Sequence, residues 1–228
     1  MFQGFTERTS GFLWDLSFNN ERPWFLEHKA EFETVLHEPF KALAADTLAL
    51  VRQRHPERDL NCHVSRIYRD ARRLFGRGPY KDHLWFTVFD GEKDLGGPAF
   101  FFELGAATYS YGLGYWDASP TAMEAFRRAV DANPARFERM AKALARDREL
   151  RIAGPEYKRP KGERGAIINP YYNRRYLMLS VERDFGGDAL SPQLPQLLTG
   201  TYEELFPMYD FFWDCWRSSN EVAEKQSF

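Results

Sequence analysis

A long stretch of strand-like sequence with no helical segment inside it is the feature that most limits how this chain can fold. Residues 62–69 and 83–90 have strand-like composition, and residues 99–104 and 108–113 flank a short turn. Parallel strands need long crossover connections, whereas antiparallel strands can follow one another directly. The sequence therefore predicts an antiparallel meander and argues against βαβ units.

Helices are expected before this stretch. Residues 6–18 carry apolar side chains at helical spacing. Asn20 is a suitable N-cap for a second helix, and Pro39 is expected to kink or restart that helix before it ends near Arg54.

Helices are also expected after the strands. Pro120 and Pro134 each follow a capping residue, which predicts two helix starts. The remaining expected elements are a basic surface loop at residues 154–165, a strand at 175–182 and a helical end at 191–217 with breaks near Gly200 and Pro207.

These elements predict an α+β fold, in which an antiparallel sheet packs with N-terminal, central and C-terminal helices. The chain has 228 residues, of which 43% are hydrophobic and 28% charged, an ordinary globular balance. No linker-like tract divides it, so a single α+β domain over residues 1–228 is expected.

Charge and cysteine content limit the partners and the compartment. The formal net charge of −2 gives no global field toward nucleic acid or anionic membrane, so neither partner is expected. The first residues lack the pattern of a signal peptide, and no apolar run reaches the roughly 18 residues of a membrane span. We therefore predict a cytoplasmic protein in which Cys62 and Cys215 stay unbonded.

Several chemistries lack their sequence motifs. The Gly112-Leu113-Gly114 segment has neither the third glycine nor the context of a dinucleotide site. The five histidines form no HExxH pattern, and two cysteines cannot complete a cysteine-rich zinc site. The sequence also lacks a P-loop and a GxSxG segment. No cofactor and no metal are expected.

The densest polar cluster lies at residues 65–83. Arginine recognises carboxylate or phosphate through two parallel hydrogen bonds. Strand neighbours point to opposite faces, so Arg66 or Arg69 should approach the core or a cleft, with Asp70 as its nearest acceptor. In the competing interpretation, which charge alone favours, Asp70 pairs with a neighbouring arginine on a solvated edge. The candidate catalytic residues are Asp70 and Lys81, and the candidate ligand-binding residues are Arg66, Tyr68, Arg69, Tyr80 and His83.

A second basic run covers residues 157–162 and includes Lys158 and Arg159. Arg164 follows it, and two further arginines stand at 174–175. We add Lys158 and Arg159 to the candidate ligand-binding residues, on a flap that closes over the first cluster. For each of these residues singly, a solvated loop is the competing interpretation.

Four segments resemble a family of bacterial and fungal proteins catalogued as domain of unknown function twenty-four sixty-one. They are the opening MFQGFT, the NNERPWF segment from Asn19, the SRIYRD segment from Ser65 and the GPYKDH segment from Gly78. The KRPKG loop from Lys158 is also similar to one in that family. The stretch at 169–175 departs from the family pattern. The resemblance implies a single α+β domain and no particular reaction.

Two functions remain open. In the first, the protein binds a small ligand bearing phosphate or carboxylate through its Arg, Lys and Tyr cluster, with or without catalysis. In the alternative, it is a non-catalytic interaction module for a protein or nucleic-acid partner. The sequence does not decide whether the protein is an enzyme or what its oligomeric state is.

Overall fold

The computed structural model describes residues 1–228 except 71, 73, 75, 92–95, 116–117, 148 and 227–228, with residues 221–226 described by their backbone alone. Six strands form an open antiparallel sheet in the order β1-β2-β3-β4-β6-β5. The predicted α+β meander is confirmed, because the first four strands neighbour one another in chain order. The strands are β1 (Leu60–Val64), β2 (His83–Asp90), β3 (Ala99–Gly105), β4 (Thr108–Tyr115), β5 (Arg151–Ala153) and β6 (Leu177–Asp184).

The first strand is shorter than predicted. β1 ends at Val64, which pairs with Phe86 of β2, instead of continuing to residue 69. Just beyond it, the Ser65 hydroxyl accepts a hydrogen bond from the Trp85 N–H at 3.0 Å. A side chain thereby takes the place of a ladder carbonyl at this position. The Ser65 N–H still donates to the Trp85 oxygen, and an isolated antiparallel bridge joins Tyr68 to Tyr80.

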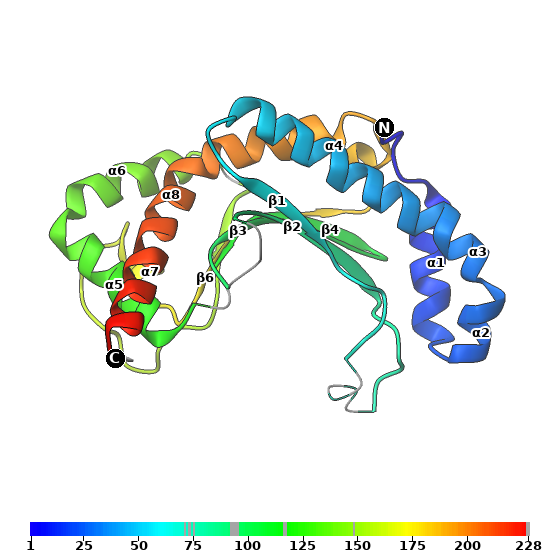
Figure 1. Cartoon of the computed structure of the whole chain (residues 1–228), viewed down its shortest axis with the longest axis horizontal. Helices are drawn as coiled ribbons and strands as arrows, with labels where there is room; N and C mark the ends of the chain where they lie inside the picture. The colour runs from blue at the N-terminus through cyan, green and yellow to red at the C-terminus, as the bar shows by residue number, and fades with distance from the viewer. Residues whose placement is uncertain are drawn as a thin grey trace. The chain divides into compact units, whose positions relative to one another are not determined.

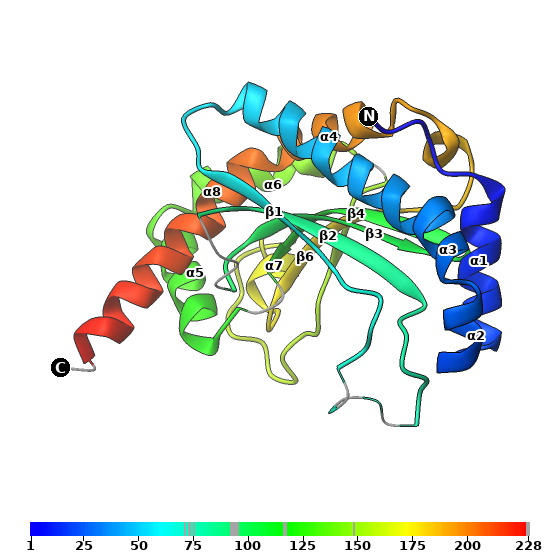
Figure 2. The same ribbon diagram turned by 45° about the vertical axis from the view of Figure 1, so that its right-hand side comes forward.

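Contacts divide the chain into two compact units, and whether they behave as one domain stays a prediction. The first unit comprises Met1–Glu92, Phe101–Tyr111 and Glu182–Gly200. Its helical elements are α1 (Glu7–Phe18), α2 (Arg22–Glu27), α3 (Lys29–Phe32), the π-helical turn η1 (Glu33–His37), α4 (Glu38–Arg54) and the 3₁₀ turn η3 (Gly187–Leu190). Figure 1 shows α4 lying along β1, and Figure 2 shows the segment between β1 and β2 projecting past the strand ends.

Aromatic rings fill the core of the first unit. Phe40 of α4 lies 5.7 Å from Phe86 of β2 and 5.8 Å from Phe102 of β3, measured between ring centroids. Phe5 joins this cluster from the N-terminal segment. Buried rings of this size contribute much of the hydrophobic free energy that fixes α4 on the strands.

The predictions for Pro39 and for Asn20, both in the first unit, have different outcomes. Pro39 lies in the first turn of α4, directly after the π-helical turn η1, where the helix restarts as predicted. The prediction that Asn20 caps the next helix is wrong, because the N-cap of α2 is Glu21. The Asn20 side chain instead binds the backbone of Tyr80.

The second unit comprises Lys93–Phe100, Gly112–Val181 and Thr201–Phe228. Its helices are α5 (Pro120–Ala132), α6 (Pro134–Leu144), α7 (Asn169–Tyr172) and most of α8 (Leu194–Gln226). The two predicted helix starts are confirmed, since Ser119 and Asn133 cap α5 and α6 with side-chain hydrogen bonds. In the core of this unit, Phe126 of α5 packs edge-on against Phe137 of α6 and against Phe212 of α8.

The predicted breaks in the last helix are wrong. α8 is a single helix of 33 residues that contains both Gly200 and Pro207. In the second unit, Phe100 stacks on Tyr202 and Tyr209 of α8, each at 4.8 Å between ring centroids. This packing on both sides of Pro207 offsets the hydrogen bond that proline removes. Within the described part of the chain, neither α8 nor any other helix is long and apolar enough to cross a membrane.

Candidate functional site

The predicted cluster at residues 65–83 is organised around the buried side chain of Tyr80. Asn20 grips the Tyr80 backbone, since its Nδ2 donates to the Tyr80 oxygen at 3.0 Å and its Oδ1 accepts from the Tyr80 nitrogen at 2.9 Å. The Tyr80 ring stacks on Phe25 at 4.1 Å and lies 5.3 Å from the Tyr68 ring. A Cβ at Gly78 would lie 2.2 Å from Asn20 Oδ1, so this grip needs glycine there.

Two cations of this cluster bind the backbone of their own chain. Arg69 donates from Nε to the Tyr80 oxygen at 2.7 Å and from Nη2 to Asp82 at 3.2 Å. Lys81 donates from Nζ to the Arg66 oxygen at 2.7 Å. Burial, with a smaller contribution from the charge of Arg69, lowers the pKa of Lys81. These bonds hold the projecting segment together and occupy donors that an anion would need.

The remaining residues of the cluster lie nearer to solvent. Asp70 accepts three hydrogen bonds from Arg72, at 3.0 Å from the backbone nitrogen, 3.1 Å from Nε and 2.8 Å from Nη2. The Arg66 side chain is exposed, and Tyr68 is 53% exposed. His83 makes a 2.9 Å contact through Nδ1 with Asp82. The structure thus places Tyr68 and Arg69 against Tyr80, and Lys81 against the backbone of Arg66. A ligand role for these residues stays a prediction.

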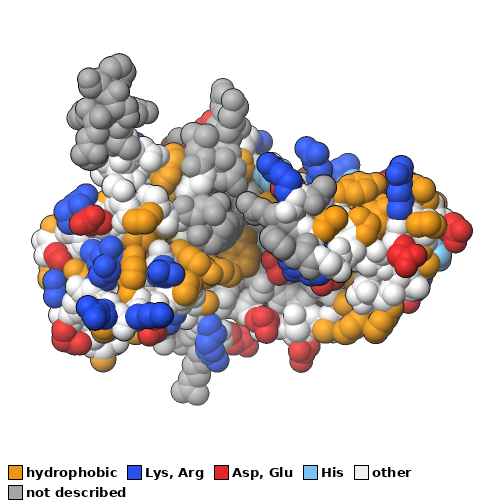
Figure 3. All heavy atoms as spheres, turned by 90° about the horizontal axis from the view of Figure 1, so that it is seen from below, with side chains coloured by type: hydrophobic (Ala, Val, Ile, Leu, Met, Phe, Trp, Pro, Cys, Tyr) orange, Lys and Arg blue, Asp and Glu red, His pale blue; other side chains and the backbone are white. Residues whose placement is uncertain are grey.

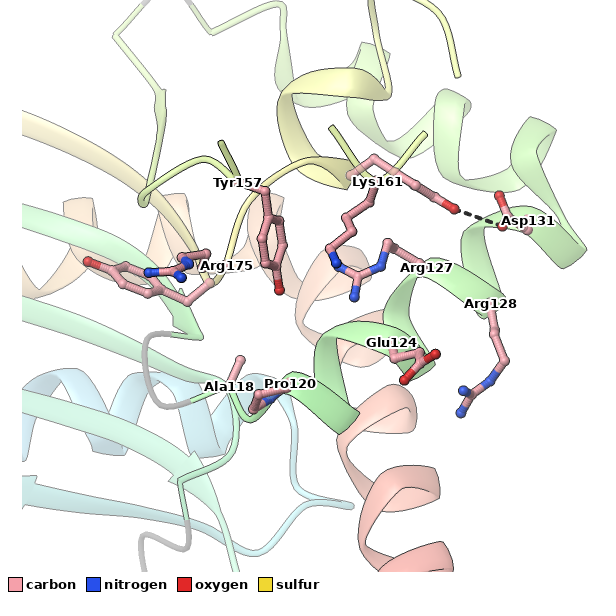
Figure 4. Close-up of a pocket in the computed structure, with 11 residues that line it drawn as sticks. Ala118, Pro120, Glu124, Arg127, Arg128, Asp131, Tyr157, Lys161 and Arg175 are labelled. Carbon is pink, nitrogen blue, oxygen red and sulfur yellow. Dashed lines mark hydrogen bonds between the residues drawn. The ribbon is translucent and has the colours of Figure 1, made fainter. Parts of the chain in front are cut away.

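A pocket of about 740 Å³ lies in the second unit, between the start of α5 and the basic loop. Figure 4 shows its lining, and Figure 3 shows Lys and Arg side chains gathered on the surface of this unit, at the left of that view. The lining residues are Ala118, Pro120, Glu124, Arg127, Arg128, Asp131, Tyr157, Lys161, Tyr172, Arg175 and Tyr176. We call it the Tyr157 pocket.

Three cations surround the ring of Tyr157. The Lys161 Nζ lies 4.6 Å from the ring centroid, and the guanidinium carbons of Arg127 and Arg175 lie at 5.5 Å and 5.8 Å. Arg175 is on one side of the ring, and Arg127 and Lys161 are on the other (Figure 4). Within the described ranges, none of the three forms an ion pair with a carboxylate. The ring thus gathers positive charge that is not paired directly with a carboxylate among the described residues.

Arg127 also has a buried hydrogen-bond donor. Its Nη1 atom is shielded from solvent and has no hydrogen-bond partner among the described residues. Buried donors of this kind are ordinarily satisfied by protein, by water or by a ligand. Among the described pocket residues, Arg127 is therefore the one whose buried donor an anion would satisfy.

The basic loop is positioned by two asparagines of the α7 region. Asn173 Oδ1 accepts from the Lys161 nitrogen at 2.7 Å and from the Gly162 nitrogen at 3.3 Å, and its Nδ2 donates to the Gly162 oxygen at 3.1 Å. Asn169 Oδ1 accepts from the Arg164 nitrogen at 2.7 Å. These bonds fix the backbone that carries Lys161 beside the Tyr157 ring.

A hydrogen-bond network at the rim of the pocket engages Asp131, one of the two carboxylates among the described lining residues. Asp131 of α5 accepts from Arg164 Nε at 2.6 Å and from the Tyr172 hydroxyl at 2.8 Å. The hydrogen bond from Arg164 is the main reason that the pKa of Asp131 lies below its ordinary value, with Tyr172 adding to the effect. Asp131 therefore ties α5 to the loop and is already engaged by a cation.

The two basic-run residues predicted as ligand binders, Lys158 and Arg159, are exposed and do not line the pocket. Whether their loop closes over the first cluster stays a prediction. Sequence reasoning missed Arg127 and Asp131 entirely. Their spacing on α5, four residues apart on one helix face, was a usable signal, but only the fold shows that this face meets the loop.

Both cysteines are free thiols, and burial raises the pKa of each to about 12. A thiol with a raised pKa is a poor nucleophile at neutral pH, because the thiolate is the reactive form. The described residues also contain no group of three or more His, Cys, Asp or Glu side chains placed to hold a metal ion.

The fold and the pocket define an α+β protein with a cationic, tyrosine-lined cavity. The family model described as "Conserved hypothetical protein (DUF2461)" matches residues 8–211, and the chain belongs to this family. The resemblance read from the sequence motifs is therefore confirmed. A comparison with curated proteins finds no match.

Proposed function

We propose that this protein binds a small anionic ligand in the Tyr157 pocket. The observation that carries the proposal is the group of three cations around one tyrosine ring, of which Arg127 has a buried donor without a partner among the described residues. With a small turn of the Arg127 guanidinium, a ligand that supplies acceptor oxygens would satisfy that donor and relieve the repulsion among the cations. The pocket volume of about 740 Å³ lies in the range typical of small-molecule sites.

The pocket supports this function better than the cluster at residues 65–83 does. In that cluster, Arg69 and Lys81 donate to backbone carbonyls, and Asp70 accepts from Arg72. An anion there would have to compete with hydrogen bonds that already exist. In the Tyr157 pocket, binding adds hydrogen bonds without breaking an ion pair of the three central cations.

The start of α5 adds a further favourable contribution. Pro120 is the first residue of a helix of 13 residues, and it lines the pocket together with Ala118. The partial positive charge of a helix N-terminus stabilises a nearby anion. The helix end and the side-chain cations thus act in the same direction.

A second candidate function rests on the exposed rings of the first unit. Phe18 is 80% exposed and stacks on Trp14, which is 46% exposed, and Tyr68 is 53% exposed. Exposed aromatic side chains of this kind are enriched in protein–protein interfaces. They favour the alternative of an interaction module, whose partner the rings alone do not specify.

A thermal-shift series tests the proposal. Phosphate, citrate and acetate are titrated against the wild-type chain, the Arg127→Gln variant and the Arg139→Gln control, which loses an exposed charge of α6 outside the pocket. A ligand at about 100 times its Kd stabilises the native state by about 2.7 kcal/mol. For a chain of this size, that raises the Tm by about 5–10 °C.

We expect at least one anion to raise the Tm of the wild type and of Arg139→Gln, and to have little effect on Arg127→Gln. No shift with any anion would refute the proposal. An equal shift in all three proteins would place anion binding elsewhere and refute it as well.

A further inference from the structure

We infer that the ligand of the Tyr157 pocket carries a doubly charged phosphate group, and that the pocket recognises this group without stacking an attached aromatic base on Tyr157 or Tyr172. The inference rests on the proposed function and adds the chemical class of the ligand. It follows from the charge balance of the lining, the hydrogen-bond donors and the two occupied faces of the tyrosine ring.

The charge balance of the pocket favours more than one negative charge. Among the described residues, its lining contains four cations, Arg127, Arg128, Lys161 and Arg175, and two carboxylates. One of these, Asp131, is engaged by Arg164. Among the described lining residues, Glu124 then remains to offset four cations, so a singly charged carboxylate ligand would leave most of this positive charge uncompensated.

The donors of the pocket also suit a phosphate. Guanidinium groups bind phosphate oxygens with pairs of parallel hydrogen bonds, and Arg127 brings a buried Nη1 with no partner in the described structure. Arg175 and Lys161 flank the same ring, so donors approach from more than one direction (Figure 4). A tetrahedral group with three terminal oxygens can accept from several of these donors at once, whereas a planar carboxylate has only two oxygens.

Tyr157 is not available as a stacking platform for a nucleobase. Arg175 lies on one side of its ring, and Arg127 and Lys161 lie on the other (Figure 4). Tyr172, the other lining tyrosine near the loop, has the Arg164 guanidinium 5.0 Å from its ring centroid and donates its hydroxyl to Asp131. The organic part of the ligand is therefore not selected by stacking on either of these rings.

Methyl phosphate and methyl sulfate provide a matched test of the phosphate class. Both are small tetrahedral esters, but at pH 7.5 the phosphate is mainly a dianion and the sulfate is a monoanion. Isothermal titration at low salt should give methyl phosphate an affinity at least about tenfold higher, corresponding to about 1.4 kcal/mol. The advantage should shrink at pH 5, because a phosphate monoester takes up its second proton near pH 6.

Equal affinities for the two esters would overturn the phosphate inference while leaving anion binding intact. Binding of neither ester, together with no response to any other anion, would mean that the proposed function itself fails. The Lys161→Gln variant, altered at an exposed position, should lose most of the preference for methyl phosphate, whereas Arg139→Gln should keep it.

Three phosphorylated compounds test the statement about stacking. Adenosine 5′-phosphate, uridine 5′-phosphate and ribose 5-phosphate carry the same charged group with a purine, a pyrimidine or no base. Their affinities should agree within about threefold, because base stacking on an aromatic side chain is worth about 1–3 kcal/mol and would exceed that range. A preference of more than about tenfold for either nucleotide over ribose 5-phosphate would contradict the inference.

Discussion

Two basic, aromatic regions of this protein have similar composition and different surroundings. In the first unit, Arg69 and Lys81 donate to the carbonyl oxygens of Tyr80 and Arg66. In the second unit, Arg127 and Lys161 face the ring of Tyr157 without a carboxylate partner in the described ranges. A cluster of cations in a sequence thus becomes a candidate site only where the fold leaves its donors unused.

The two regions also differ in what holds them in place. The first depends on a buried ring and on the Asn20 grip, so its polar groups stabilise a projecting segment. The second is held by asparagines and by the Asp131–Arg164 pair at its rim. Among the described residues, the side chains of its central cations make no hydrogen bond to the protein. Substitutions should therefore lower stability in the first region and ligand affinity in the second.

The largest effect is expected at Tyr80. Its side chain is 2% exposed and stacks on Phe25. Tyr80→Ala should lower the free energy of unfolding by about 3–5 kcal/mol, as other large-to-small core substitutions do. Urea denaturation measures this, with Tyr68→Ala as the matched control, since the Tyr68 ring is half exposed and should cost far less. Equal losses for the two variants would show that the segment is not organised around Tyr80.

Arg69 should show the next largest effect. Its side chain is 13% exposed and donates to Tyr80 and Asp82. Arg69→Ala leaves the Tyr80 carbonyl without this donor and should cost about 1–3 kcal/mol. The exposed Arg66 is the control, for which alanine should change stability by less than about 0.5 kcal/mol. If Arg69→Ala kept full stability and lost the anion response, the first region would be the ligand site and the proposed contrast between the two regions would be wrong.

Asn173 should act on the position of the loop. Asn173→Ala removes the acceptor for the amides of Lys161 and Gly162 and should cost about 1–2 kcal/mol locally. Hydrogen exchange followed by NMR should show faster exchange at these two amides, while the amides of α4 in the first unit keep their rates. Unchanged exchange at Lys161 would mean that Asn173 does not position the loop.

The smallest effect is expected from Asp131 and depends on pH. Its folded pKa lies below the ordinary value of 3.8, so its contribution to stability is present above that pH and is lost as the pH falls through the folded pKa. The side chain is 39% exposed, and solvent screening limits the gain to about 0.5 kcal/mol. Urea denaturation should show Asp131→Asn slightly less stable than wild type at pH 6 and equal to it once the pH lies below the folded pKa of Asp131. A constant difference at all pH values would exclude this cause.

Local patterns in the sequence predicted much of the fold. β2 has the predicted bounds, and α5 and α6 begin at the predicted prolines, because caps and alternation are short-range signals. The breaks in α8 were wrong, since ring packing around Pro207 comes from Phe100, about a hundred positions earlier in the chain. The three-residue strand β5 gives too short a pattern to detect.

The site could be predicted only in part. The charge run identified Tyr157, Lys161 and Arg175 as members of a basic region, because clustered charge is visible in a sequence. It could not identify Arg127, whose importance depends on α5 meeting the loop, or Asn173, which lies where the family pattern fits poorly. Local sequence predicts a helix cap at Asn20 because its actual partner, Tyr80, lies 60 positions away.

The most direct test of the central claim compares two double variants of equal charge by isothermal titration with inorganic phosphate. Lys161→Gln/Arg175→Gln removes two cations of the Tyr157 pocket, and Arg66→Gln/Lys81→Gln removes two cations of the first cluster. Because both lower the net charge by the same amount, any difference between them is local. We predict that the pocket variant weakens phosphate binding at least about tenfold and that the cluster variant changes it less than about twofold. The reverse result would contradict the account, because it would assign anion binding to residues 65–83.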